Sequence, residues 1–142
     1  MFSGRLLTPD QARAIPLRVL AHLGDAVFDL FEREREALSV SSAKKMHQNI
    51  VRRVQATAQA DHLDAISPKL NDSELELVRQ ARNLKARGAR SASQGAYRKS
   101  TAFEALIAYL YLTAPDRLEE ILRLTKTEGN PPGDNRAPSG DP

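Results

Sequence analysis

An all-α fold, a single-domain helical bundle, is predicted by three features of the 142-residue sequence. First, residues 100–112 read STAFEALIAYLYL, and Glu104 is the only charged residue from Ala102 to Leu112. A helix that is apolar nearly all round is a buried helix. Second, the other long segments place apolar residues at helical spacing. Third, no strand-like alternation, repeat or coiled-coil heptad occurs, so we expect amphipathic helices around a central one.

The composition bounds the class of protein. A chain of 142 residues with 41% hydrophobic residues suffices for one domain with its own core. The absence of cysteine excludes a disulfide framework and a thiolate metal site, and it fits a reducing cytoplasm. The N-terminus lacks the apolar core of a signal peptide, and we expect no membrane span. We expect residues 1–126 to form the domain and residues 127–142, rich in Pro and Gly, to be a disordered tail.

The first two helices are marked by prolines. Thr8 can cap a short helix that begins at Pro9 and ends before Pro16, and Pro16 opens a long helix to about Leu38. The predicted inner stripe of this long helix is Leu20, Leu23, Val27, Leu30 and Phe31.

Gly24 and Asp25 stand out in this long helix. A glycine inside a helix costs about 1 kcal/mol relative to alanine. Gly24 beside Asp25 therefore permits the close approach of another chain or a ligand, or it merely allows tight helix packing with Asp25 in solvent.

The middle of the chain reads as two helices. Ser41 or Ser42 can cap a helix over residues 43–60, and residues 61–66 add a turn that stops near Pro68. Asn71 or Asp72 then caps a helix to about Ala86, with Glu74 in its first turn. The predicted inner positions are Met46, Ile50, Val51 and Val54 in the first helix and Leu75, Leu77 and Val78 in the second.

The last third holds the central helix. Residues 87–96, RGARSASQGA, read as a flexible basic loop between glycines. Tyr97 begins the central helix, and Pro115 starts a last helix through about Leu124.

Basic residues form two tracts without acids. Residues 37–60 carry Lys44, Lys45, Arg52 and Arg53, and residues 77–103 carry Arg79, Arg82, Lys85, Arg87, Arg90, Arg98 and Lys99. Two such tracts in one small domain indicate a polyanionic partner. The alternative is a solvated basic surface.

Glu104 is the candidate for chemistry within the apolar stretch. Because burial of an unpaired charge costs several kcal/mol, this carboxyl group must be paired, protonated or bound to a metal. The alternative is an acid at the helix edge that reaches solvent or an arginine.

Several segments resemble the catalytic domain of the ribonuclease III family. Residues 20–27, LAHLGDAV, are similar to its signature helix, and residues 103–107, FEALI, to its second acidic helix. Met46-His47 and residues 56–60 resemble its middle helices. Residues 82–85, RNLK, followed by residues 97–105, YRKSTAFEA, resemble a narrower group, the Mini-III ribonucleases. The resemblance covers about residues 15–124.

The resemblance implies an all-helical endonuclease domain that acts as a homodimer on double-stranded RNA with Mg²⁺. It also implies maturation of large-subunit (23S) ribosomal RNA precursors without an appended double-stranded-RNA-binding domain. Asp25 and Glu104 then act as the catalytic and metal-binding acids. Ala21 and Thr101 stand where the larger enzymes carry two further acids, so the number of metal ions stays open, as does assistance by a ribosomal protein.

The RNA-binding residues that we predict come from the basic tracts and the matching motifs. They are Lys44, Lys45, His47, Arg79, Arg82, Asn83, Lys85, Arg87, Arg90, Tyr97, Arg98 and Lys99. Three hypotheses follow: a magnesium-dependent endoribonuclease, a catalytically silent helical RNA-binding dimer, and a protein–protein module in which Glu104 is a structural pairing partner. The presence of both acids favours the first.

Overall fold

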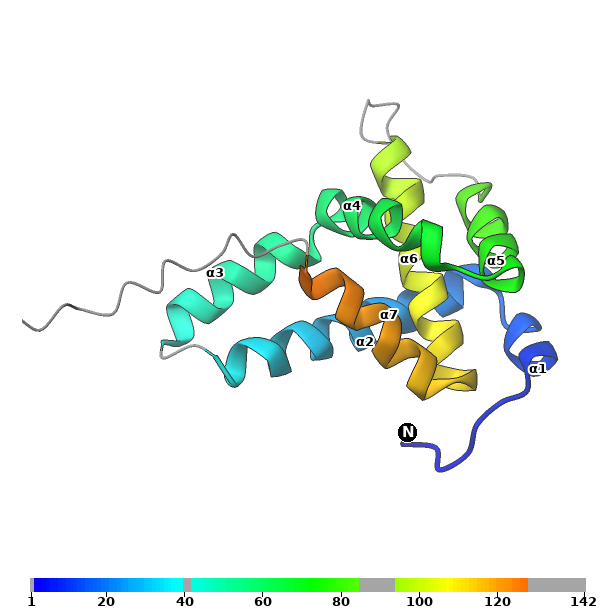
Figure 1. The fold of residues 1–142 in the computed structure, drawn as a ribbon, viewed down its shortest axis with the longest axis horizontal. Coiled ribbons are helices and arrows are strands. Elements are labelled where there is room, and N and C mark those ends of the chain that lie inside the picture. The colour runs from blue at the N-terminus through cyan, green and yellow to red at the C-terminus, as the bar shows by residue number, and fades with distance from the viewer. Residues whose placement is uncertain (1, 40–41, 85–93, 128–142) are drawn as a thin grey trace, which may run out of the picture.

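The computed structural model describes residues 2–39, 42–84 and 94–127, which fold into one all-α domain (Figure 1). The elements are α1 (Pro9–Arg13), α2 (Leu17–Ala37), α3 (Ala43–Val54), α4 (Ala56–Ile66), the 3₁₀ turn η1 (Ser67–Lys69), α5 (Asp72–Arg82), α6 (Gln94–Thr113) and α7 (Pro115–Thr127). The described segments contain no strand, as predicted. None of their helices combines the length and the apolar character that crossing a membrane requires.

Helix α6 is the centre of the fold, as its apolar sequence predicts. It packs against α2, α4, α5, α7 and α1. Phe103, Leu106 and Ile107 are fully buried, and Phe28 of α2 packs edge-on against Phe103 at a centroid distance of 5.0 Å. The helix begins at Gln94, three residues before the predicted start at Tyr97.

The buried face of α2 is wider than the predicted stripe, of which Leu20 is buried and Leu23, Val27 and Phe31 are partly buried against the core. It carries Leu20, Ala21, Gly24, Phe28, Glu32 and Glu36. Leu30 is 53% exposed, although we predicted it to be an inner residue. The helix also turns two small residues, Ala21 and Gly24, inward, which a search for large apolar side chains overlooks.

The predicted helix over residues 43–60 is wrong, because it divides at Gln55. This residue has an extended backbone (φ −63°, ψ 150°) and separates α3 from α4, which continues without interruption to Ile66. No Pro or Gly marks the break. Packing accounts for it: α4 lies on α6, whereas α3 runs beside the far half of α2 as an arm (Figure 1). Val51 is accordingly 42% exposed rather than buried.

Leu75 is a further correction, since its side chain is 40% exposed. Helix α5 turns Glu74, Leu77, Val78 and Ala81 inward, and Leu75 lies about 100° around the helix from Glu74. The predicted capping by Asn71 is confirmed, because its side chain accepts from the Glu74 backbone N–H in a capping box.

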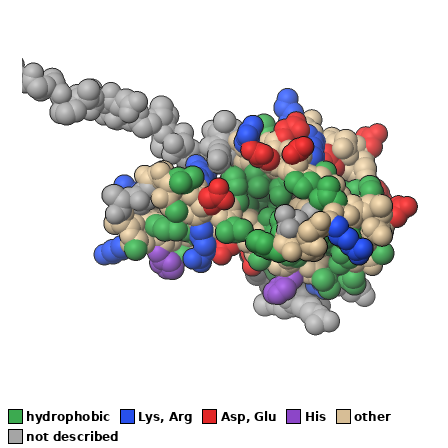
Figure 2. Space-filling view, turned by 90° about the horizontal axis from the view of Figure 1, so that it is seen from below, with side chains coloured by type: hydrophobic (Ala, Val, Ile, Leu, Met, Phe, Trp, Pro, Cys, Tyr) green, Lys and Arg blue, Asp and Glu red, His purple; other side chains and the backbone are tan. Residues whose placement is uncertain are grey.

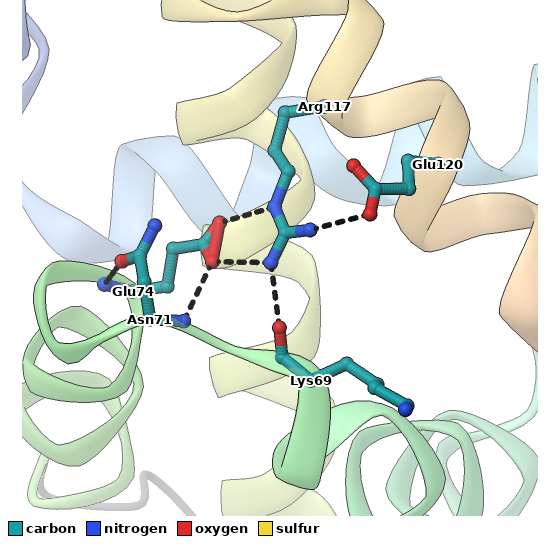
Figure 3. A network of polar contacts seen from close by, with 5 residues as sticks. All are labelled: Lys69, Asn71, Glu74, Arg117 and Glu120. Carbon is teal, nitrogen blue, oxygen red and sulfur yellow. Dashed lines mark hydrogen bonds and ion pairs between the residues drawn. The ribbon is translucent and has the colours of Figure 1, made fainter.

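Glu74 is buried because it also joins α5 to α7. Figure 3 shows Arg117 of α7 between two acids. Its Nη2 donates to Glu74 Oε1 at 2.8 Å and to the Lys69 carbonyl at 2.7 Å, and its Nη1 lies 3.0 Å from Glu120 Oε1. One guanidinium group thus holds the start of α5, the end of η1 and the first turn of α7 together.

Two expectations fall partly outside the described residues. Of the predicted loop over residues 87–96, residues 94–96 belong to α6 and the others are not described. The predicted tail over residues 127–142 overlaps the described chain only at Thr127, the last residue of α7.

Candidate active site

Gly24 brings the two predicted catalytic acids to the same place. A Cβ atom built on Gly24 would lie 1.7 Å from the backbone oxygen of Glu104, and no side chain fits such a gap. Helices α2 and α6 therefore cross backbone to backbone at these two residues. Asp25, the next residue along α2, is carried to the edge of this crossing, beside the side chain of Glu104. Gly24 therefore allows close packing of two helices, and the space beside it is filled by the backbone of Glu104.

The pKa of Glu104 is shifted by its burial and by the neighbouring Asp25. Its pKa is raised to about 7, first by burial and then by the charge of Asp25, against which the neighbouring Gln59 amide lowers it. Asp25 itself is exposed, and Glu104 is half-buried. Two carboxyl groups held this close favour a cation between them, because the cation offsets their repulsion.

A pocket of about 380 Å³ opens beside the two acids. Its lining comes from α2, the end of α3, α4 and the first half of α6 and comprises Arg18, Ala21, His22, Asp25, Val54, Ala56, Gln59, Tyr97, Ser100, Thr101 and Glu104. Among the residues predicted for the site, it unites Asp25, Glu104 and Tyr97. Ala21 and Thr101, which stand in place of the acids of the larger enzymes, line the same pocket.

Sequence reasoning missed four polar residues of this pocket. Arg18 and His22 precede Asp25 by seven and three positions, so helical spacing could have placed them on its side of α2. Gln59 and Ser100 are buried, at 1% and 6% exposure. Neither residue type indicates a role by itself, and only their places in segments 56–60 and 97–105, which resemble family motifs, could have drawn attention to them.

The donor set of the pocket suits one hard cation. Carboxylate oxygens are the ligands that Mg²⁺ prefers, and this ion commonly takes one or two of them and completes its shell with water and phosphate. Asp25 and Glu104 meet that requirement. Among the residues that the structure describes, no group of three or more His, Cys, Asp and Glu side chains is placed to hold a metal. Two side-chain carboxylates supply fewer oxygen ligands than a two-metal clamp requires, so the number of ions stays open.

A second pocket gathers predicted RNA-binding residues. It has a volume of about 580 Å³ and is lined by the end of α5 and the start of α6, including Arg79, Arg82, Asn83 and Arg98. Arg98 and Tyr97 also line a small recess that lies between this pocket and the first one. A basic surface thus leads from the end of α5 toward the two acids.

The remaining predicted RNA-binding residues are dispersed. Lys44, Lys45 and His47 are exposed on the α3 arm, away from the α5–α6 pocket. Lys99 forms an ion pair with Asp64 at 2.9 Å, and Arg79 of the α5–α6 pocket donates hydrogen bonds of 2.9 and 2.6 Å to Glu76. Lys85, Arg87 and Arg90 lie outside the described residues.

Comparison with known proteins assigns the chain to a family. Residues 18–115 match the ribonuclease III domain. The chain is 43% identical over 112 residues to the Mini-ribonuclease 3 of Symbiobacterium thermophilum, covering 77% of this chain and 86% of the relative. It is 40% identical over 118 residues to that of Gloeobacter violaceus, covering 83% and 87%.

A solved structure agrees with the fold. A crystal structure of a Fusobacterium nucleatum protein superposes with a TM-score of 0.70 at 26% identity, over 81% of this chain and 92% of that one. The matched residues 18–115 include both acids and the crossing at Gly24. The chain therefore belongs to the ribonuclease III family, within its Mini-ribonuclease 3 group, and is an endoribonuclease.

Proposed function

We propose that this endoribonuclease cleaves double-stranded RNA in a magnesium-dependent reaction, with Asp25 and Glu104 as its catalytic pair. The observation that carries the proposal is the crossing at Gly24, which sets the two acids side by side at the mouth of a pocket. The physiological substrate that we propose is the 23S ribosomal RNA precursor, cleaved in the cytoplasm at its ends. A ribosomal protein remains a candidate partner in that step.

The chain's own groups divide the work. Asp25 and Glu104 would hold the cation from two different helices, so their spacing is set by the fold and not by a loop. Bound magnesium supplies an activated water and neutralises charge on the scissile phosphate. Arg18 and His22 line the same pocket and can contact the neighbouring phosphates. RNA duplexes are recognised mainly by shape, phosphates and 2′-hydroxyls, which suits the basic surface at Arg82 and Arg98.

We further propose that the chain acts as a homodimer. Figure 2 shows a broad hydrophobic area across the face of the molecule seen from below. Several large apolar side chains are exposed on the described surface, among them Val19, Leu30 and Leu38 at 56%, 53% and 83%. Exposed apolar side chains of this kind favour association with a second copy of the chain.

The proposed function predicts the behaviour of Asp25→Asn. The amide keeps the shape of the side chain and removes the anionic ligand, so cleavage of a long RNA duplex with Mg²⁺ should fall at least about 100-fold. Thermal stability and duplex affinity should stay near those of the parent. Asp29→Asn is the matched control, because Asp29 lies one helical turn away and pairs with Arg33 at 2.9 Å. Full activity of Asp25→Asn would refute the catalytic assignment.

The same assay separates the alternatives. Cleavage that needs Mg²⁺ supports the endoribonuclease. Duplex binding without cleavage would instead support a silent RNA-binding dimer, and neither activity would support a protein–protein module.

A further inference from the structure

A buried polar pair lies behind the two acids. Gln59 of α4 is 1% exposed and Ser100 of α6 is 6% exposed, and both line the pocket that contains Asp25 and Glu104. Ser100 Oγ donates a short hydrogen bond to Gln59 Oε1. The amide nitrogen of Gln59, by contrast, is buried and makes no hydrogen bond with any described residue. A buried amide donor without a partner costs about 1–3 kcal/mol, so its presence calls for an explanation.

The bond from Ser100 decides which end of the amide faces the acids. Because the Gln59 oxygen accepts from Ser100, the NH₂ group is the end that remains for the pocket. An NH₂ group donates hydrogen bonds and cannot be a metal ligand. Gln59 and Glu104 line the same pocket, so the unpaired donor end of the amide lies on the side of the Glu104 carboxyl group.

We propose that Gln59 is a positioning residue that orients the carboxylate of Glu104 by donation from its amide, and that Ser100 holds the amide in the required orientation. This inference rests on the proposed function, since it assigns Glu104 to the cation site. Groups that donate a hydrogen bond to a metal-binding side chain restrict its orientation, and their removal typically costs about 10–100-fold in metal affinity or activity. Gln59 and Ser100 come from different helices, so α4 would contribute to the site without touching the RNA.

Two substitutions test the inference. Gln59→Met keeps the length of the side chain and removes the donor, whereas Ser100→Ala leaves Gln59 in place and removes its anchor. We expect kcat on an RNA duplex to fall about 10–100-fold in Gln59→Met, with KM for the duplex changed less than about twofold. Ser100→Ala should change kcat in the same direction by a smaller factor. Gln80→Met is the control, because Gln80 is exposed on α5 and donates to Glu76.

Metal binding provides a readout besides cleavage. Without RNA, Mn²⁺ binding followed by electron paramagnetic resonance should weaken about tenfold in Gln59→Met and remain unchanged in Gln80→Met. Melting temperatures report whether each variant is folded. Should Gln59→Met fail to fold, Ser100→Ala carries the same test. Unchanged kcat and unchanged Mn²⁺ affinity in the folded variants would overturn the inference and leave the pair a purely structural contact.

Gln59→Glu distinguishes a donor from a ligand. A third carboxylate without donor hydrogens should repel Glu104 and lower both kcat and Mn²⁺ affinity. Tighter Mn²⁺ binding with retained cleavage would mean that this position supplies a ligand oxygen, which contradicts the inference. Asp25→Asn is measured alongside. If Asp25→Asn is inactive and Gln59→Met is not impaired, only the role of Gln59 fails, whereas an active Asp25→Asn removes the proposed function itself.

Discussion

Glu104 has a pKa that depends both on its burial in the fold and on the charge of Asp25. Its half-buried carboxyl group faces Asp25, and these two influences raise its pKa to about 7. The unfolded chain has the ordinary value of 4.5. Between these two values the folded protein holds a proton that the unfolded chain has released. Without metal, the free energy of unfolding therefore decreases as the pH rises from about 4.5 to about 7. Above about pH 7 the contribution of Glu104 decreases no further.

Glu104→Gln should remove this pH dependence. At pH 8 without metal, the variant should be as stable as the parent or more stable, by up to about 2–3 kcal/mol, because no buried charge remains. It should not cleave RNA, and added Mg²⁺ should raise its melting temperature less than that of the parent. Chemical denaturation at pH 5 and pH 8 measures the effect. A large drop in stability with cleavage retained would instead identify Glu104 as a structural pairing partner.

The sequence made some of these residues visible and hid others. Glu104 was noticeable because it interrupts an otherwise apolar helix, and Asp25 because it follows a glycine inside a helix, but only the resemblance to the ribonuclease III family implied that the two form one site. Gln59 was not, since its partner Ser100 lies 41 positions away and neither residue type implies a role alone. Contacts between distant residues of ordinary type leave no local signal in one sequence.

At the scale of the helices, Gly24 controls the distance between α2 and α6. Gly24→Ala would place a methyl group against the Glu104 backbone, and a backbone atom cannot move aside as a flexible side chain can. We expect a loss of at least about 2–3 kcal/mol in the free energy of unfolding, together with loss of cleavage. The same change at Gly95 of α6, where a Cβ atom has nothing within 4 Å, should be neutral or slightly stabilising. Equal stabilities of the two variants would refute the close crossing.

The link between α5 and α7 makes a second prediction at this scale. Burial raises the pKa of Glu74, but the bonds from Arg117 and from the Asn71 backbone outweigh it, so the net pKa is lowered. A lowered pKa stabilises the fold above the ordinary value and stops doing so as the pH falls through the folded value. Glu74→Gln should cost about 2–3 kcal/mol at pH 7 and less in acid.

Glu120→Gln is the matched control for this link. Glu120 binds the same guanidinium group, but its side chain is 65% exposed, so its loss should change the stability by less than about 1 kcal/mol. Urea denaturation of both variants at pH 7 and pH 3 provides the comparison. A cost of Glu74→Gln that does not shrink in acid would show that packing, not charge, holds α5 to α7.

Across the whole molecule, the basic surface at the α5–α6 pocket should dominate RNA affinity. Arg82→Gln with Arg98→Gln should weaken duplex binding and flatten its dependence on salt by about one to two in the log–log slope. Arg123→Gln on α7, where Arg123 pairs with Glu119 at 2.5 Å, should leave that slope unchanged. Binding titrations between about 50 and 200 mM salt measure this slope. An unaltered slope in the double variant would place the RNA elsewhere.

The overall architecture was predictable to the extent that burial controls it. The apolar helix at residues 100–112 and the capping residues Thr8 and Asn71 followed from local chemistry. The break at Gln55 and the burial of Ala21 and Gly24 did not, because both depend on how close the helices lie to one another. Tertiary packing overrides a local pattern where the pattern counts only large apolar side chains.

The crossing at Gly24 also determines how this enzyme loses its activity on heating. Neither of the proposed acids sits on a loop or near a helix end, since both lie within long helices at the point of closest contact. Amide hydrogens of such a turn exchange with solvent only when the whole domain opens. Catalytic geometry and the native fold thus form one cooperative unit. We therefore expect the temperature at which cleavage stops to coincide with the melting temperature of the domain.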